Sequence, residues 1–166
     1  MPDVARIVVM GVSGCGKSRI GAALARRLGL LFVDGDNLHP DSNIAKMAQG
    51  QPLTDADRAP WLDAVGAALA SGPKVIACSA LRRAYRDRIR AAAGNVTFVH
   101  LVGDRAVLQR RVISRPGHFM PANLLDSQLA TLETPDADEG AIAVDLAQTP
   151  EKIIAEVIST GRFGKV

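Results

Sequence analysis

The chain has 166 residues, of which 48% are hydrophobic and 22% charged, with a net charge of +3, a balance that predicts one globular domain (1–166) and excludes disordered and collagen-like chains. No apolar run reaches the ~18 residues that span a bilayer, and no secretory leader is visible, so we expect a cytoplasmic protein without a membrane partner. Two cysteines cannot build a disulfide framework, and 4% aromatic residues are too few for a nucleic-acid stacking platform, so we expect no nucleic-acid partner.

Short apolar runs alternate along the chain with longer amphipathic stretches. Strands are expected at residues 7–10, 31–33, 75–78, 96–102 and within 141–146, and helices at 17–28, 41–49, 54–70, 84–93, 104–114, 122–132 and 150–159. Gly29 ends the first helix, Thr54 caps the third, and Pro60 predicts a kink or a restart within it. This alternation predicts an α/β fold with a mostly parallel sheet that helices cover on both faces.

The segment between the first strand and the first helix fits the phosphate-binding pattern Gly-x4-Gly-Lys-Ser. Its residues are Gly11, Val12, Ser13, Gly14, Cys15, Gly16, Lys17 and Ser18. Composition alone predicts roughly 0.003 such matches, which disfavours the alternative of a simple glycine-rich turn. Glycines let the backbone bend around an anion, and the helix N-terminus attracts negative charge. We therefore expect ATP here, with Lys17 on its β- and γ-phosphates and Ser18 on Mg²⁺.

Polar residues follow the second expected strand, at the sheet edge where open α/β folds bind ligands. Of Asp34 and Asp36, one is predicted to support Mg²⁺ and the other to accept the proton of a substrate hydroxyl. An Asx turn with a helix cap is the alternative. His100 lies within an apolar strand and is expected to be a hydrogen-bonded core histidine, whereas His118, in a basic loop, is a candidate ligand contact.

Arginine is concentrated in the second half of the chain. From Arg82 to Arg115 nine arginines face two acidic residues, a local excess of seven positive charges. A solvated basic surface is the alternative for most of them, but the group as a whole favours a small phosphate-bearing ligand. Arg111 and Arg115 lie one helical turn apart before a glycine-containing loop, so we predict a mobile lid around 111–121 that closes over ATP.

Several segments beyond the phosphate loop carry a more specific signal. They are 34–40 (Asp-Gly-Asp-Asn-Leu-His-Pro), 43–47, 50–62, 78–87, 118–121, 127–128 and 131–133. Together they resemble the gluconokinase family of small P-loop kinases over residues 7 to about 154. The resemblance implies a P-loop NTPase of the nucleoside-monophosphate-kinase type, a three-layer α/β/α domain with a five-stranded parallel sheet in the order 2-3-1-4-5. It also implies transfer of the ATP γ-phosphate to the 6-hydroxyl of D-gluconate, and a homodimer.

The same resemblance assigns roles to individual residues. Asp34 would support Mg²⁺ and Asp36 would hold the acceptor hydroxyl. The sugar-acid site would include His39, Lys46, Arg58, Arg83, Arg86 and Gln128. From the residues themselves, Arg111 and Arg115 are predicted to act with Lys17 on the phosphates, and His118 is added as a substrate contact. Such a basic site suits a carboxylate-bearing acceptor, because guanidinium groups bind carboxylates bidentately.

Two other functions remain open at this stage. A shikimate kinase would be expected to carry a glycine triplet after the third strand, where Cys78, Ser79 and Ala80 stand. A nucleotide-dependent switch without phosphotransfer would need neither Asp36 nor an arginine lid.

The implied strand order places Cys15 and Cys78 at one sheet edge. Because Cys15 lies near a helix N-terminus and Lys17, a lowered thiol pKa and oxidation sensitivity with protection by ATP are predicted, with two inert buried residues as the alternative.

Overall fold

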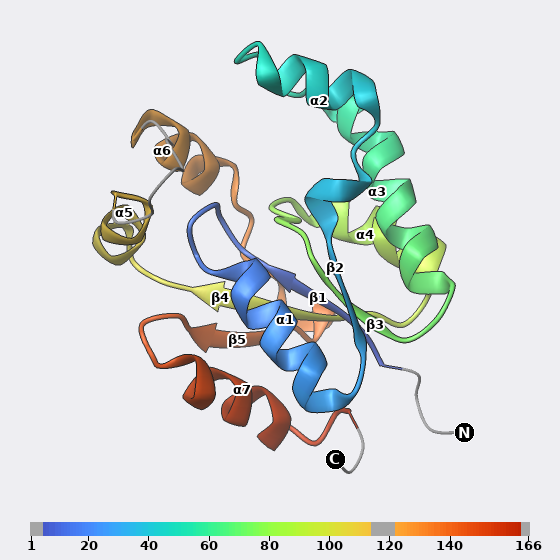
Figure 1. Ribbon diagram of the computed structural model, residues 1–166, viewed down its shortest axis with the longest axis vertical. Coiled ribbons are helices and arrows are strands. Elements are labelled where there is room, and N and C mark those ends of the chain that lie inside the picture. The colour runs from blue at the N-terminus through green and yellow to red at the C-terminus, as the bar shows by residue number, and fades with distance from the viewer. Residues whose placement is uncertain (1–4, 114–121, 164–166) are drawn as a thin grey trace.

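The computed structural model describes residues 5–113 and 122–163 (Figure 1). Its centre is a five-stranded sheet, with all neighbouring strands parallel, in the order β2-β3-β1-β4-β5. The strands are β1 (Arg6–Met10), β2 (Leu31–Asp34), β3 (Lys74–Ala77), β4 (Thr97–Val102) and β5 (Ile142–Asp145). The predicted fold class and strand order are confirmed.

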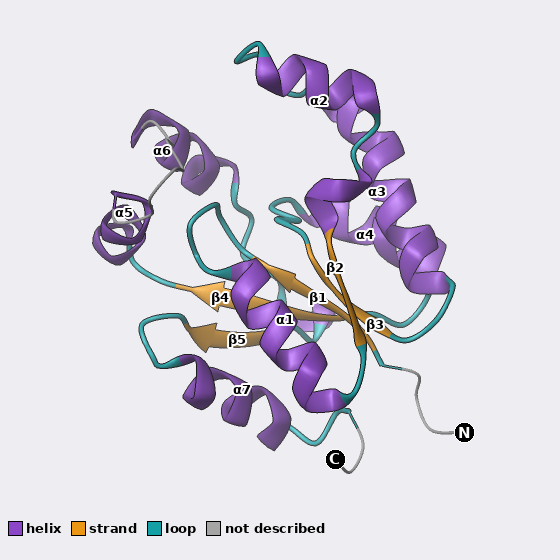
Figure 2. Cartoon of the chain, viewed as in Figure 1, coloured by secondary structure: helices purple, strands orange, loops and turns teal. Residues whose placement is uncertain are grey.

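Helices connect the strands in the expected order (Figure 2). They are α1 (Lys17–Leu28), α2 (Asp41–Ala48), α3 (Asp55–Ala70), α4 (Arg83–Ala93), α5 (Arg105–Ile113), α6 (Ala122–Thr131) and α7 (Pro150–Ser159). Two short 3₁₀ helices, η1 (Gly35–Leu38) and η2 (Ala137–Glu139), were not expected. Thr54 caps α3 in a reciprocal capping box with Asp57, as predicted for the cap. The expected restart at Pro60 is wrong, because α3 continues through it, anchored by a buried face that includes Trp61, Leu62 and Val65.

Each face of the sheet has its own buried core, as strand alternation requires. Val9, Leu101 and Val144 pack with α1 and α7 on one face. Val8, Ile76 and Phe98 pack with α3 and α4 on the other. These side chains are at most 2% exposed, so the sheet is fixed from both sides. None of the helices in the described residues is long and apolar enough to cross a membrane.

The carboxyl ends of the parallel strands bring distant segments to one edge. The loop after β1 leads into α1, η1 follows β2, and residues 78–82 follow β3. Figure 1 shows α2 and the start of α3 on one side of this edge, and α5 and α6 on the other. The edge is therefore where ligand-binding side chains are to be sought.

Candidate active site

The phosphate-binding loop spans residues 11–16, between β1 and α1. Gly11 has φ 149°, and a Cβ there would meet the Cys15 Sγ at 2.8 Å. Gly16 caps α1 in the left-handed region (φ 92°) and offers no side-chain cap. The first turn of α1 thus presents backbone N–H groups and the positive end of its dipole at this loop, the arrangement that binds a phosphate.

Two cations flank the loop. The Lys17 Nζ donates to the Val12 carbonyl at 3.3 Å. The Arg111 guanidinium reaches the loop from α5, since its Nη1 would lie 3.5 Å from a Cβ on Gly16. Its Nη2 donates to the Leu146 carbonyl, just beyond β5. The structure therefore brings together two of the three cations predicted to act on phosphate.

Asp34 links α1 to the residues that follow β2. The Ser18 Oγ donates to its Oδ2 at 3.1 Å, and the Asp36 backbone N–H donates to its Oδ1 at 3.0 Å. The cap alternative is thus realised, because Asp34 is the N-cap of η1, while its second oxygen faces Ser18. The Asp36 side chain is exposed at this edge.

The oxygens of Ser18 and Asp34 fit a Mg²⁺ site of the kind found in phosphate-transfer enzymes. Mg²⁺ prefers oxygen ligands and usually takes only one or two from protein side chains, completing its shell with phosphates and water. Within residues 5–113 and 122–163, no group of three or more His, Cys, Asp or Glu side chains forms a metal cage. The donor set therefore suits a metal that arrives with a nucleotide.

His39 is held at the same edge by Trp61 and Asn43, each of which is itself fixed by a hydrogen bond. Its ring stacks on Trp61 with centroids 4.1 Å apart and 15° between planes, and the Trp61 Nε1 donates to the Gly35 carbonyl at 2.8 Å. The Asn43 Nδ2 lies 3.2 Å from the His39 Nδ1 and also donates to the Asp57 carbonyl at 2.9 Å. Burial lowers the pKa of His39 against the opposing effect of Asp36. A neutral ring that accepts at Nδ1 must carry its proton on Nε2.

Ion pairs on α2 and α3 hold further basic groups near this edge. The Lys46 Nζ lies 2.6 Å from the Asp57 Oδ2. The hydrogen bond from Lys46 and those from Thr54 lower the pKa of Asp57 to about 2. The Arg58 Nη1 donates to the Tyr85 hydroxyl at 3.3 Å, and that hydroxyl donates to the Asp55 Oδ1 at 2.6 Å.

Gln128 connects α6 to the phosphate loop. Its Oε1 accepts from the Ser13 backbone N–H at 2.6 Å, and its Nε2 donates to the Ser13 Oγ at 2.8 Å. Although the two residues are 115 positions apart in sequence, this pair of bonds places Gln128 directly at the loop.

Comparisons with known proteins agree with this geometry. A family model described as "AAA domain" matches residues 7–135. The chain is 48% identical to a gluconokinase of Gluconobacter oxydans, over 92% of this chain and 88% of that protein. It is 43% identical to the thermoresistant gluconokinase of Escherichia coli, over 95% and 94%.

The chain belongs to the gluconokinase family. A crystal structure of a gluconokinase from Sinorhizobium meliloti superposes with a TM-score of 0.87 and 48% identity, covering 96% of this chain and 92% of that one. The resemblance seen in residues 7 to about 154 is thereby confirmed.

Two arginines expected at the sugar-acid site of this gluconokinase-family chain have other partners. Arg86 is fully buried, its Nε lies 2.7 Å from the Glu139 Oε1, and its Nη1 and Nη2 donate to the Ala80 and Glu133 carbonyls. The ligand role for Arg86 is therefore wrong in this structure, because no surface of the side chain is open to a substrate. Arg83 is half-exposed and pairs with Asp136 at 2.9 Å and with Asp138 at 2.7 Å, so its guanidinium has acidic partners, and its contact with the sugar acid stays a prediction.

The thiol prediction is corrected as well. Burial raises the pKa of Cys15, although Lys17 and the neighbouring backbone N–H groups oppose it. Burial likewise raises the pKa of Cys78 to about 12. Both thiols are buried, so the expected lowering of the Cys15 pKa is wrong, because burial outweighs Lys17 and the helix N-terminus; oxidation sensitivity and its protection by ATP stay predictions. Arg115 and His118 lie outside the described residues.

Sequence analysis missed two supports of this site. Trp61 and Asn43 both hold His39, and Asn43 is only 2% exposed. Asn43 is the buried residue of a short helix that is otherwise mostly exposed. Its partners become apparent only after α2 and α3 pack together.

Proposed function

We propose that this chain is an ATP-dependent gluconokinase that transfers the γ-phosphate of ATP to the 6-hydroxyl of D-gluconate. One observation carries the proposal: a single carboxylate, Asp34, bonds the phosphate-loop helix through Ser18 and fixes the backbone of Asp36. The exposed carboxylate of Asp36, two residues after Asp34, is the group that we assign to the acceptor hydroxyl. Gluconate is proposed as the substrate because the chain belongs to the gluconokinase family.

The phosphate loop and its cations have the role of binding and charge stabilisation. Backbone N–H groups of the loop and first turn of α1 bind the phosphates, and Lys17 and Arg111 stabilise charge that develops on the transferred group. Ser18 and Asp34 would hold Mg²⁺, which neutralises phosphate charge when bound. Asp36 accepts the proton of the attacking hydroxyl.

The acceptor side is proposed to be formed by His39, Lys46, Arg58 and Gln128. The fixed Nε2–H of His39 donates to a hydroxyl or carboxylate oxygen of the sugar acid. Lys46 and Arg58 supply positive charge toward its carboxylate, although Lys46 also pairs with Asp57, and Arg58 contacts both Asp55 and the Tyr85 hydroxyl. Gln128, bonded to Ser13, aligns the acceptor side with the phosphate loop.

Further features of the proposal concern the rest of the chain. We retain a single domain over 1–166, with a lid around 111–121 in which Arg115 closes on ATP and His118 contacts the acceptor. Of that range the structure describes only 111–113. We also propose that the protein forms a homodimer and is located in the cytoplasm, where ATP is available.

An acceptor comparison tests the proposal. ATP consumption is measured with D-gluconate, shikimate and AMP in parallel, and the product is identified by ³¹P NMR. We expect turnover with gluconate and a phosphomonoester on its C6 oxygen. Turnover with shikimate or AMP in place of gluconate, or nucleotide binding without turnover on any acceptor, would contradict it.

A further inference from the structure

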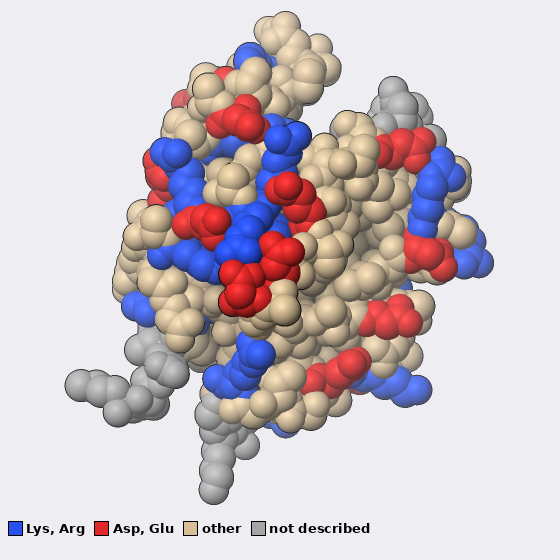
Figure 3. Space-filling model, turned by 180° about the vertical axis from the view of Figure 1, so that it is seen from behind, with Lys and Arg blue, Asp and Glu red and all other residues tan. Residues whose placement is uncertain are grey.

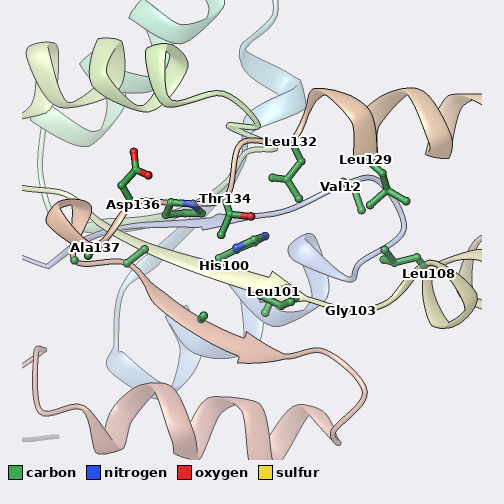
Figure 4. Close-up of a pocket in the computed structure, with 15 residues that line it drawn as sticks. Val12, His100, Leu101, Gly103, Leu108, Leu129, Leu132, Thr134, Asp136 and Ala137 are labelled. Carbon is green, nitrogen blue, oxygen red and sulfur yellow. The ribbon is translucent and has the colours of Figure 1, made fainter.

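His100 on β4 is a buried histidine whose Nδ1 has no hydrogen bond. Only 4% of the residue is exposed, and its Nδ1 is the one buried side-chain polar atom in the described part of the chain that lacks a hydrogen-bond partner. The expectation of a hydrogen-bonded core histidine is therefore right about burial and wrong about the bond. Figure 4 shows the ring beside a hollow with aliphatic walls that include Val12, Leu108 and Leu132. Because protein atoms cover this nitrogen, the hollow offers no polar group there to a ligand.

The indole of Trp61, at the edge of the candidate active site, is by contrast a buried polar group with a partner. The residue is 4% exposed, and its Nε1 donates to the Gly35 carbonyl at 2.8 Å. Its neighbours Leu62 and Val65 on α3 are buried in the same core, so the indole projects from a well-packed helix. Unlike the acidic and basic side chains that are interleaved on the surface in Figure 3, this bond is buried, so water and salt compete little with it.

The peptide group between Gly35 and Asp36 is held at both of its polar atoms. Its carbonyl accepts from the Trp61 Nε1, and its N–H donates to the Asp34 Oδ1 at 3.0 Å. A Cβ on Gly35 would clash with the Ala77 carbonyl oxygen, so this peptide is packed directly against the end of β3. Because a peptide group is planar, two bonds on its opposite sides fix the direction in which the chain enters Asp36.

Trp61 also contacts the far end of the same short helix. The helix η1 spans Gly35–Leu38, and the ring of His39, the next residue, stacks on the indole. The N–H of the indole thus acts on the backbone of Asp36, whereas its ring face acts on His39. These two contacts use different parts of one side chain, so a substitution can remove the first and keep the second.

We propose that Trp61 is a positioning residue for phosphotransfer, whose indole N–H holds the peptide between Gly35 and Asp36 from the side opposite Asp34 and so directs the Asp36 carboxylate at the acceptor hydroxyl. The inference rests on the proposed function, in which Asp36 accepts the proton of that hydroxyl. It assigns to the N–H an effect on the rate of transfer, and to the ring face an effect on acceptor binding through His39.

Trp61→Phe separates the two contacts, because phenylalanine keeps an aromatic face for His39 and lacks the N–H. With D-gluconate as acceptor, kcat should fall by about 10- to 100-fold, the cost of misplacing a catalytic group by about 1 Å. The KM for gluconate should change by less than about twofold. Val65→Ala removes buried volume further along the same helix and is the control for lost packing. It should leave both constants within about twofold of the parent chain, while urea unfolding reports the stability of each variant.

A double-mutant comparison tests whether Trp61 acts through Asp36. In Asp36→Asn the positioned carboxylate is already absent, so adding Trp61→Phe should lower the remaining kcat by less than about threefold. A general structural role for Trp61 predicts instead the same fold-loss in both backgrounds.

A tryptophan analogue keeps the test valid if Trp61→Phe fails to fold. The chain has one tryptophan, so 3-benzothienylalanine, which carries sulfur in place of the indole N–H, can replace Trp61 alone with little change of shape. It should reproduce the loss of kcat at unchanged KM. The inference is overturned if the folded replacement leaves kcat within about threefold of a parent chain that phosphorylates gluconate, raises KM instead, or loses as much in Asp36→Asn. A parent chain without turnover on gluconate would overturn the proposed function and, with it, this inference.

Discussion

Two groups of basic side chains in this molecule make different kinds of contact. At the phosphate loop, Lys17 and Arg111 donate to backbone carbonyls. On α4, by contrast, Arg83, Arg86, Arg88 and Arg90 all pair with carboxylates. The α4 arginines are therefore held in a network of carboxylates from other segments, a structural role that their number in the sequence does not reveal.

The α4 pairs are made by acids that are remote in sequence. Asp136, Asp138 and Glu139 come from the segment between α6 and β5, and they bind arginines of α4 about fifty positions earlier. Arg105 of α5 pairs in the same way with Asp126. Much of the local excess of positive charge between residues 82 and 115 therefore ties the 133–139 segment and α6 to the rest of the domain.

Lys17→Met gives the largest expected effect on the phosphate-loop side of this comparison. Methionine keeps the length of the side chain and removes its charge, so phosphotransfer should fall by at least about 10³-fold while the fold is retained. Turnover in a coupled ATP assay measures this, with circular dichroism as the folding check. Lys152→Met, an exposed position on α7, is the matched control. Near-normal turnover in folded Lys17→Met would show that this loop is not the active site.

Asp36→Asn tests the carboxylate that the phosphate-loop edge positions. Asparagine retains the shape but accepts a proton poorly, so turnover should fall by ~10²–10⁴-fold, with little change in ATP affinity measured by calorimetry. Asp41→Asn, at the exposed start of α2, should remain within about threefold on the same scale. A loss of less than about tenfold in Asp36→Asn would assign the proton acceptor to another group.

Arg86→Met tests the α4 side through stability. The substitution removes one of the two guanidinium partners of the buried Glu139, which keeps Arg90, and it leaves the Ala80 and Glu133 carbonyls without their donor. It should therefore cost about 3 kcal/mol in the free energy of unfolding. Arg88→Met breaks a half-exposed pair with Asp63 and should cost no more than about 1 kcal/mol. Urea unfolding at pH 7 compares the two. Equal losses would mean that burial does not distinguish them.

The pH dependence of the unfolding free energy tests the ion pairs of Glu139 on the α4 side. Burial alone would raise its pKa, but hydrogen bonds from Arg86 and Arg90 reverse this and lower it to about 2, from an ordinary 4.5. A carboxyl with a depressed folded-state pKa stabilises the protein above pH 4.5 and loses that contribution as the pH falls toward 2. The difference in unfolding free energy between the parent chain and Glu139→Gln should therefore shrink between pH 5 and pH 3. The comparison cancels Asp57, which titrates in the same window. A constant difference would contradict the assignment.

Sequence patterns predicted what is encoded by neighbouring residues. The strands, the helices and the phosphate loop follow from local periodicity and motif spacing, and the meeting of the segments after β1 and β2 follows from the shared edge of a parallel sheet. Arg86, Cys15 and His100 were interpreted less well, because their behaviour depends on burial and on partners from distant segments. A buried arginine on an amphipathic helix has the same sequence signal as one that faces a ligand.

Arg83→Met carries the smallest expected effect and separates the two groups most directly. The family resemblance implies a sugar-acid contact for Arg83, whereas its guanidinium is bound by Asp136 and Asp138. Because these pairs are solvent-exposed, their loss should cost at most about 1 kcal/mol of stability, and the KM for gluconate should change by less than about twofold, since that pairing commits the side chain elsewhere. Arg58→Met, measured in parallel, removes positive charge proposed to face the acceptor carboxylate and should raise KM by about tenfold, the loss of one charge-assisted hydrogen bond. A tenfold rise in KM for Arg83→Met, with an unchanged kcat, would show that Arg83 leaves its acidic partners to bind substrate. Arg83, the first residue of α4, would then belong with the ligand-binding arginines.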